Sequence, residues 1–401
     1  MEFSIQQDGP DNASKSFSTK KLYRQVEQIK DAVNAFNKSR EGDQFLDKNV
    51  IFVGCTGAGK STLVNYLAGN ELKAAKNKYQ DDVYNIKASN AVEGIEIGNS
   101  TSSCTKIPAK LISENKVAYW DCPGFGDTEG QIQDITNAYF INELFNKSTQ
   151  AFAALVVDFN TIVAKRHNQF LDLANEVFKM GLIDSLQSVS LVVTSSKLSK
   201  ERIIEYLSDE ILSAISGDNS QNLEKLVQYY IKNRDQVTVF PMPREPGKID
   251  TNNAKTIQEV VNSVAPLSDT IVKPSISEGT INAISKWGKL TNQIIKEIIQ
   301  LKISESFREI YQNCKLQNEY SELKVSLKAI KDKCDAIHQS HNEDELIEAY
   351  QEFQRELQIS NEKDDHLLSE NIDLLKFFTI YNSEVSQDLS SFDSVNQTKM
   401  L

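Results

Sequence analysis

The apolar positions near the N-terminus recur at helical spacing. Residues 1–18 are rich in Ser, Asp, Asn, Gln and Lys, and we expect them to be disordered. Over residues 19–47, apolar side chains follow alternating steps of four and three, which predicts an amphipathic helix with coiled-coil-like spacing. Packing on its own domain is favoured over a dimerisation seam, because two heptads are too few for an independent coiled coil. The apolar positions are Leu22, Val26, Ile29, Val33 and Phe36.

Short apolar runs then alternate with helical patterns, most clearly up to about residue 245. The helical patterns include Gln169–Met180 and Lys200–Ile215. This alternation predicts an α/β domain over residues 48–275, with a mostly parallel sheet and helices on both faces. The two runs that flank residues 113–116 are joined by a short turn, so we expect that pair to be antiparallel. The strand-like runs are Val50–Val53, Ile107–Ile112, Val117–Trp120, Ala153–Val157, Val189–Val193 and Val237–Phe240.

Residues 276–401 carry helical patterns throughout. No proline follows Pro274, and apolar faces recur at helical spacing. We expect an all-helical bundle or hairpin whose role is to bind a protein partner that the sequence does not identify. His338 and His341 lie close together but have no third candidate ligand, so they are interpreted as surface residues.

A glycine-rich stretch follows the run Val50–Val53 and precedes a helical pattern. Residues 54–61, GCTGAGKS, match G-x-x-x-x-G-K-[ST] in the strand–loop–helix context that binds phosphate. Glycine permits the backbone angles that turn amides towards an anion, and the helix near Lys60 directs its positive dipole end at the same place. We expect Lys60 to bridge the β- and γ-phosphates and the Ser61 hydroxyl to bind Mg²⁺. The expected nucleotide contacts here are Gly54, Cys55, Thr56, Gly57, Ala58, Gly59, Lys60, Ser61 and Thr62.

The stretch VAYWDCPGFGD, about sixty residues further on, supplies a second element. Asp121 ends a strand beside the phosphate loop, where its carboxylate reaches Mg²⁺, usually through water. The amide of Gly124 then touches the γ-phosphate and makes this loop a sensor of the triphosphate. Taken alone, a strand-ending Asp before a Pro-Gly turn is a common structural arrangement.

A threonine between these two elements is the third candidate. Nucleotide switches carry one whose hydroxyl binds Mg²⁺ and whose amide binds the γ-phosphate. The stretch STSSCTKIPAKL offers Thr101 and Thr105, and Thr105 is favoured because it directly precedes the strand-like run Ile107–Ile112. A Ser/Thr-rich exposed loop is the alternative interpretation of the same residues.

Composition narrows the class of protein. The chain has 401 residues and a net charge of −12, which argues against nucleic-acid binding but leaves a local basic patch open. Five cysteines without a CxxC spacing indicate neither a disulfide framework nor a zinc site. The N-terminus lacks a signal-peptide core, and the apolar stretch Ala151–Val157 is too short to cross a bilayer. We expect a cytoplasmic protein without a transmembrane segment, whose peripheral attachment to a membrane stays open.

Together, GCTGAGKST, DCPGF and an intervening threonine resemble the translation-factor-related class of P-loop GTPases. The loop is most similar to the AIG1/IMAP type, with septins and the Toc receptors nearby, and Thr105–Pro108 resembles the T-x-x-P switch of dynamin-like GTPases. The resemblance covers about residues 48–245. It implies binding of GTP/GDP and Mg²⁺, slow hydrolysis in which Lys60, Thr105 and Gly124 take part, and pairing of two G domains across their nucleotides.

The chain departs from the general GTPase pattern at two places. Phe125 stands where Ras-like enzymes carry a water-orienting glutamine, so either the Thr105 carbonyl or a polar group from a second molecule would have to orient the water. In a pair of G domains, Arg166 or His167 could reach across and stabilise charge in the transition state. Guanine is normally read by [NT]-K-x-D, but residues 194–197 are Thr-Ser-Ser-Lys. Thr194 is retained as a nucleotide contact, whereas a lysine at 197 accepts no hydrogen bond.

Three explanations of the altered base motif stay open. Another residue supplies the acceptor, guanine is held less selectively, or the nucleotide is not guanine. The stretch VFPMPREPG, which follows the last predicted strand, lies where relatives complete the base pocket. We therefore expect a slow GTPase that acts as a switch or assembly module. The alternatives are a scaffold that binds nucleotide with little hydrolysis, and an ATP-hydrolysing relative.

Overall fold

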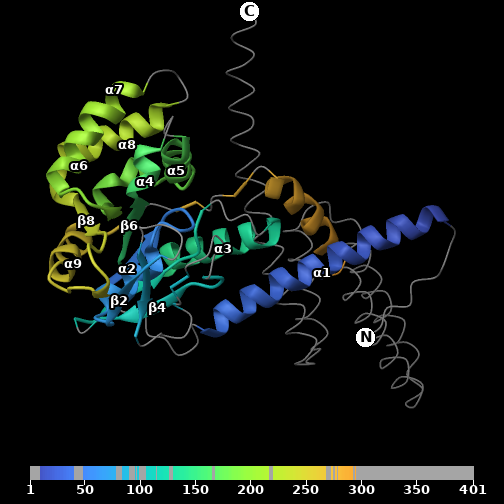
Figure 1. The fold of residues 1–401 in the computed structure, drawn as a ribbon. Helices are drawn as coiled ribbons and strands as arrows, with labels where there is room; N and C mark the ends of the chain where they lie inside the picture. Colours follow the sequence, from blue (N-terminus) through green and yellow to red (C-terminus); the bar gives the residue numbers. More distant parts are fainter. Residues whose placement is uncertain are drawn as a thin grey trace, which may run out of the picture. The chain divides into compact units, whose positions relative to one another are not determined.

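The computed structural model describes most of the chain up to residue 294 (Figure 1). One compact unit spans residues 32–277, and a second joins residues up to 31 with those from 278 on. The predicted helical region over 276–401 lies almost entirely outside the described residues and stays a prediction. The described ranges are 10–39, 48–77, 84–89, 95, 97–98, 105–113, 115–125, 130–164, 168–215, 220–267, 272–273, 276–277, 279–291 and 294.

A six-stranded sheet forms the centre of the first unit. Its strand order is β4-β5-β1-β6-β7-β8, and neighbours are parallel except for the antiparallel pair β4 and β5. The mostly parallel sheet and the antiparallel pair are therefore confirmed. The strands are β1 (Lys48–Val53), β4 (Ala109–Ile112), β5 (Val117–Asp121), β6 (Ala151–Asp158), β7 (Val189–Ser196) and β8 (Val237–Pro241).

Helices cover both faces of this sheet, as the alternating pattern predicts. Side chains alternate between faces along a strand, so Ile51 and Val53 of β1 join one core cluster while Val50 and Phe52 join another. The first cluster includes residues of α3, α5, α6 and α8, and the second includes residues of α2 and α9. These helices are α2 (Lys60–Leu67), α3 (Gln131–Lys147), α5 (Asn168–Lys179), α6 (Lys200–Tyr206), α8 (Gln221–Lys232) and α9 (Ala254–Ser263).

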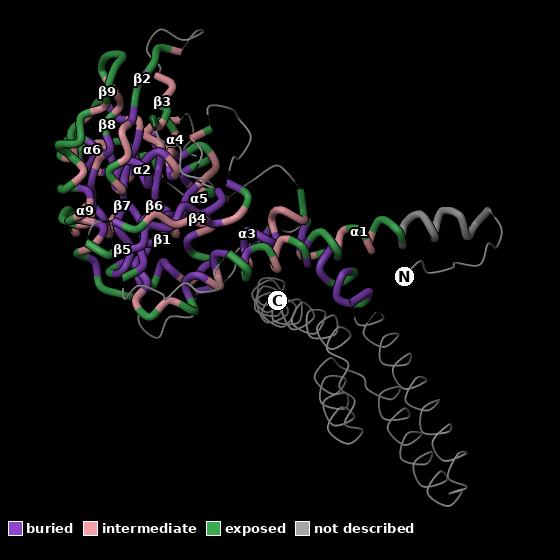
Figure 2. Tube along the Cα trace, turned by 90° about the horizontal axis from the view of Figure 1, so that it is seen from below, coloured by how far each residue is buried: buried purple, intermediate pink, exposed green. Residues whose placement is uncertain are grey.

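Several short helices connect the longer elements. The predicted helix over Lys200–Ile215 forms, but a π-helical turn at Leu207–Ile211 separates α6 from α7 (Leu212–Ala214). In Figure 2 the strands β1, β6 and β7 are buried almost throughout, which marks the hydrophobic centre of the unit. The remaining short helices are α4 (Phe159–Val163) and the 3₁₀ segments Leu182–Ser188 and Arg234–Gln236.

A second, three-stranded antiparallel sheet was not predicted. Its order is β3-β2-β9, formed by Tyr84–Ala88, Leu72–Lys76 and Gly247–Lys248. Only two positions of β2, Leu72 and Ala74, are buried. A half-exposed strand with so few apolar residues gives little sequence signal. The consequence for the site is that β3 lies beside the phosphate loop's cavity.

Helix α1 extends over Pro10–Ser39 and so differs from both expected boundaries. Its first turns fall in the segment expected to be disordered, and proline is favoured at a first helical position because its fixed φ suits the helix. Its last turn packs in the first unit, where the Phe36 ring centroid lies 4.6 Å from that of Phe140. In the second unit, the indole N–H of Trp287 donates to Gln25 Oε1 at 3.3 Å. The preference for packing on its own domain over a dimerisation seam stays a prediction.

Candidate functional site

The glycine-rich loop between β1 and α2 folds as a phosphate loop. Gly57 and Gly59 have φ of 82° and 89°, in the left-handed region where glycine carries no steric penalty. A Cβ at Gly54 would lie 2.2 Å from the carbonyl oxygen of Val156, so the loop also needs glycine to approach β6. Gly59 is the N-cap of α2, and the free amides of that helix therefore face the loop's interior.

Lys60 is held inside this loop. Its side chain is 6% exposed, and its ammonium donates to the carbonyl oxygens of Gly54 and Cys55, both at 3.0 Å. The positive charge is therefore placed among the loop carbonyls beside the start of α2. A phosphate that entered the loop would meet both this ammonium and the helix amides.

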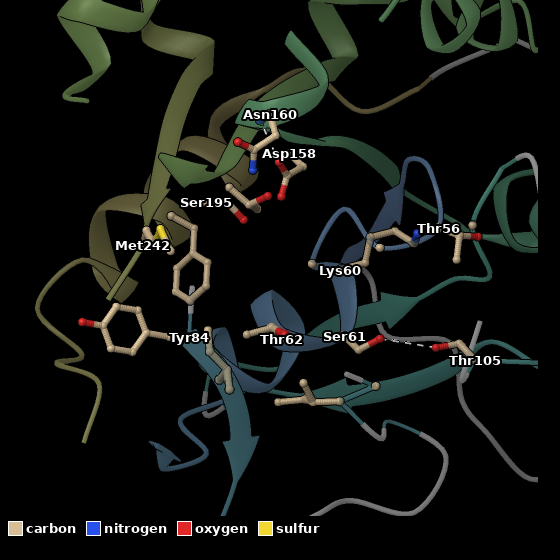
Figure 3. Close-up of a pocket in the computed structure, with 18 of the residues that line it drawn as sticks. Thr56, Lys60, Ser61, Thr62, Tyr84, Thr105, Asp158, Asn160, Ser195 and Met242 are labelled. Atoms are coloured by element: carbon tan, nitrogen blue, oxygen red, sulfur yellow. Dashed lines mark hydrogen bonds between the residues drawn. The ribbon is translucent and has the colours of Figure 1, made fainter. Parts of the chain in front are cut away.

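Three oxygen-bearing side chains meet next to Lys60. The hydroxyls of Ser61 and Thr105 lie 3.3 Å apart (Figure 3), and the Thr105 hydroxyl donates to Asp121 Oδ2 at 3.0 Å. Ser61 comes from α2, Thr105 precedes β4, and Asp121 ends β5. The structure thus brings together the three residues that the sequence predicts as Mg²⁺ contacts.

Asp121 is the most deeply buried member of this group. Its side chain is fully buried, and Oδ1 has no hydrogen-bond partner within the described structure. Burial raises the pKa of this carboxyl, while Lys60, Ser61 and Thr105 lower it in part. An orphaned carboxylate oxygen beside two hydroxyls is a hard-oxygen donor set of the type that suits Mg²⁺. The residues present therefore fit the ion.

The loop that contains Gly124 is joined to the phosphate loop through the backbone. Phe125 donates its N–H to the Gly54 carbonyl at 3.1 Å, and Thr56 donates its N–H to the Phe125 carbonyl at 3.3 Å. A Cβ at Gly124 would lie 2.4 Å from the Thr56 nitrogen, so only glycine fits there. The Phe125 ring packs against the hydrophobic core. These two loops form one backbone-linked wall of the site.

Thr194, at the end of β7, supports the phosphate loop from the other side. Its buried hydroxyl donates to the Ala58 carbonyl at 2.7 Å, and its side chain lies in van der Waals contact with the position of a Cβ on Gly59. The next residue, Ser195, has a φ of 56°, and the strand pairing shifts register between Thr194 and Ser196. The chain leaves the sheet here, next to the cavity.

A cavity of about 310 Å³ lies against these loops (Figure 3). Of the predicted nucleotide contacts, Gly54, Cys55, Ala58 and Asp121 do not line it. Asp121 contacts Thr105, which does line the cavity. The predicted residues that line it are Thr56, Gly57, Gly59, Lys60, Ser61, Thr62, Thr105, Gly124 and Thr194.

Several lining residues were missed by the sequence analysis. Asp158 ends β6 and Asn160 follows it, whereas Tyr84 and Ile86 come from the unpredicted strand β3. The only sequence signal for Asp158 is its position directly after a buried strand, where open α/β sheets bind ligands. In the proline-rich stretch, Pro241 at the end of β8 and Met242 and Pro243 after it also line the cavity.

Several candidate residues lie in parts of the chain that the structure does not describe. Thr101, Arg166, His167, His338 and His341 lie outside the described residues. The thiols of Cys55 and Cys122 are described, and burial raises the pKa of both. Within the described ranges, no helix is long and apolar enough to cross a membrane.

Comparison with known proteins gives a family match over the first unit. Residues 49–237 match the family model described as 50S ribosome-binding GTPase. No curated protein matches the chain.

Three solved structures are similar in part, each with low global similarity. A dimerization-deficient mutant of Toc33 from Arabidopsis thaliana is 14% identical, with a TM-score of 0.32 over 60% of this chain and 94% of that one. Era, solved with MgGDPNP and a segment of 16S ribosomal RNA, is 12% identical, with a TM-score of 0.27 over 60% and 66%. A member of an oligomerised bacterial dynamin pair is 14% identical, with a TM-score of 0.26 over 99% and 80%.

The predicted resemblance to P-loop GTPases is confirmed, whereas the finer likeness to the AIG1 type stays a prediction. The family match covers β1, the phosphate loop, the Asp121 strand and the end of β7. The matched range includes the phosphate loop, Thr105, Gly124 and Thr194, which line the cavity. Residues 49–237 therefore form a G domain of the P-loop GTPase type.

Proposed function

We propose that this chain is a slow, Mg²⁺-dependent GTPase whose nucleotide state controls a partner or its own assembly. The observation that supports this most directly is the hydrogen-bonded chain from Ser61 through Thr105 to Asp121, beside the phosphate loop. It links α2 to both segments that would sense the third phosphate. A phosphate loop without such a link would bind nucleotide but would have no means of reporting it.

The phosphate loop supplies the binding energy for the triphosphate. The Lys60 ammonium now donates to two loop carbonyls at 3.0 Å, and phosphate oxygens would replace them as stronger, charged acceptors. The α2 amides, ordered behind Gly59, add further donors. Because Thr194 fixes the loop through the Ala58 carbonyl, these donors are held in place before the ligand arrives.

Ser61, Thr105 and Asp121 would hold the metal. When bound, Mg²⁺ neutralises charge on the phosphate oxygens. The Ser61 and Thr105 hydroxyls would serve as oxygen ligands, and the Asp121 carboxylate would contribute through water. The free Oδ1 of Asp121 gives this carboxylate the capacity to accept such a water while Oδ2 keeps Thr105 in place.

Slow turnover follows from the residue after Gly124. The Phe125 ring packs against the core and offers no hydrogen bond, so this position does not orient a water. The backbone carbonyl of Thr105, or a polar group from a second molecule, would have to do so. The expected unassisted rate is on the order of 10⁻⁴ s⁻¹, the scale of a switch GTPase without its activator.

A scaffold that binds nucleotide but scarcely hydrolyses it is the second candidate. The same packing of Phe125 against the core favours it. The two candidates differ only in turnover, because each requires the same binding site. An adenine-specific relative differs instead in the base.

The test begins with the nucleotide released by denaturing freshly purified protein, followed by calorimetric titration of the emptied protein with Mg²⁺ and GTP. We expect bound guanine nucleotide, and loss of GTP binding in Lys60→Ala with an unchanged melting temperature. Undiminished binding in Lys60→Ala would overturn the assignment of the phosphate loop. Turnover of the dilute monomer then separates the switch from the scaffold: none at all identifies the scaffold.

A further inference from the structure

The usual base-reading aspartate is missing from this G domain. Guanine presents two neighbouring donors, the ring N1–H and the exocyclic amine, which a carboxylate accepts together. Lys197 occupies the expected position, but it is exposed and does not line the cavity. Its ammonium group also cannot accept a hydrogen bond. If the proposed function is correct, the acceptor must come from another residue of the cavity wall.

Asp158 is the only acidic residue among the described residues that line the cavity. It ends β6 and lies in register with Thr194 of β7, so it emerges from the sheet next to the altered base motif. In Figure 3, Asp158, Asn160 and Ser195 lie together on the cavity wall opposite Ser61 and Thr105. The carboxylate is thus separated from the hydroxyls that suit Mg²⁺ and placed beside Thr194, the first residue of the altered base motif.

The Asp158 carboxylate is held in one orientation. Its Oδ1 accepts the Asn160 N–H at 2.7 Å, which caps α4. A carboxylate offers about four acceptor positions. Within the described structure, the bond from Asn160 is the one hydrogen bond of the Asp158 side chain. The second oxygen therefore has acceptor capacity for a ligand, and the cap fixes the side chain in advance.

The surrounding wall suits a purine ring. Tyr84 and Ile86 from β3 and Met242 after β8 line the same cavity, and they offer aromatic and apolar surface for stacking. Adenine would present a lone pair at N1 to the carboxylate, where guanine presents a donor. The wall therefore accepts either purine by shape, and the carboxylate discriminates between them.

We propose that Asp158 is the base-selecting residue of this G domain, and that its carboxylate accepts the N1–H and exocyclic amine of guanine in place of the aspartate missing at position 197. This rests on the proposed function, because it names the residue that gives the same site its preference for guanine. The chain would then select guanine from the end of β6 instead of the loop after β7.

Asp158→Asn tests this with little disturbance of the fold. Asparagine caps helices as well as aspartate does, so its carbonyl oxygen keeps the bond from Asn160 while the amide N–H₂ faces the cavity. That group donates, and therefore matches the C2 carbonyl of xanthine and opposes the amine of guanine. Lys197→Ala is the matched control, because it alters the position that reads the base in related GTPases without touching the cavity wall.

Dissociation constants for the Mg²⁺ complexes of GTP, XTP, ITP and ATP should be measured for all three proteins. We expect wild type and Lys197→Ala to prefer GTP, and wild type to bind ITP more weakly because inosine lacks the amine. In Asp158→Asn, GTP should bind about 10- to 100-fold more weakly, and XTP should bind more tightly than it does to wild type. This reversal is the result that supports the proposal.

Two results would overturn the proposal. An unchanged ratio of GTP to XTP affinity in Asp158→Asn excludes base selection, and an equal loss for all four nucleotides indicates contact with ribose or a structural role. Should the variant fail to fold, equal affinity of wild type for GTP and ITP overturns the exocyclic-amine contact. Failure of the proposed function is recognised separately, because wild type would then bind none of the four or would bind them equally well in Lys60→Ala.

Discussion

The Thr105 hydroxyl, just before β4, donates a hydrogen bond of 3.0 Å to Asp121 at the end of β5. The start of β4 and the end of β5 lie at the same end of this antiparallel pair, so one contact ties the segment before β4 to the end of β5. Ser61, at 3.3 Å from the same hydroxyl, extends the link to the phosphate loop. Replacing Thr105 would therefore alter contacts of the phosphate loop, of the segment before β4 and of the end of β5.

Thr105→Ala should lower GTP turnover about 10- to 100-fold, the scale seen when a metal site loses a ligand's supporting contact. It removes at once one proposed hydroxyl ligand and the hydrogen bond that this hydroxyl donates to Asp121 Oδ2. Thr105→Ser keeps the hydroxyl and is the control, with turnover close to wild type. Single-turnover assays across Mg²⁺ concentrations measure both. Equal turnover in wild type and Thr105→Ala would show that another residue serves as the switch hydroxyl.

Gly124→Ala should weaken triphosphate binding and destabilise the G domain by about 1–3 kcal/mol, the range for overpacking. The added Cβ would lie 2.3–2.5 Å from Thr56 atoms, two of them in the backbone, which cannot rotate away. The loop must then separate from the phosphate loop, and its two backbone hydrogen bonds to Gly54 and Thr56 weaken. Thermal melts and GTP titration check this. Wild-type values in both would mean that the two loops do not meet in solution.

Much of this site follows from the sequence because its signals are local. Lys60 and Ser61 belong to a motif of eight residues whose strand and helix flanks are equally clear. The meeting of Ser61 with Asp121 also follows, since β1 and β5 are parallel neighbours whose carboxyl ends share one edge of the sheet. The preference for Thr105 over Thr101 came from its position just before a strand.

Other features depend on tertiary neighbours and were missed. Strand β2 is five residues long, exposes three of them and pairs with only two residues of β9, so it gives little strand signal in the sequence. Asp158 is one aspartate among many until its register with Thr194 places it at the cavity. The start of α1 at Pro10 was missed because a polar composition was interpreted as disorder.

Asp121→Asn should make the nucleotide-free protein more stable by about 0.5–2 kcal/mol while abolishing its stabilisation by Mg²⁺ and GTP. Burial raises the pKa of this carboxyl more than Lys60 lowers it, so ionised Asp121 destabilises the nucleotide-free fold. That cost is present at neutral pH and disappears as pH falls towards the ordinary value of 3.8.

Melting curves at several pH values, with and without Mg²⁺ and GTP, measure both effects of Asp121→Asn. The advantage of the asparagine variant should shrink as pH is lowered. Wild type should gain about 2.7 kcal/mol from ligand at a hundred times its dissociation constant, and the variant should gain far less. An equal gain in both proteins would remove Asp121 from the metal site.

Pairing of G domains should depend on the triphosphate. Thr105 and Gly124 both line the cavity, and each belongs to a segment that a γ-phosphate would hold in place. Once both segments are fixed, docking a second copy costs less conformational entropy than it does in the GDP state. A polar group from that second copy could then orient the attacking water that Phe125 does not.

Light scattering with a non-hydrolysable GTP analogue, with GDP and without nucleotide measures the mass of the particle in solution. Turnover should rise with protein concentration. Lys60→Ala is the control, and should stay monomeric throughout. An identical monomer mass in all three states, up to high micromolar protein, would exclude nucleotide-driven pairing and leave residues 276–401 as the partner-binding region.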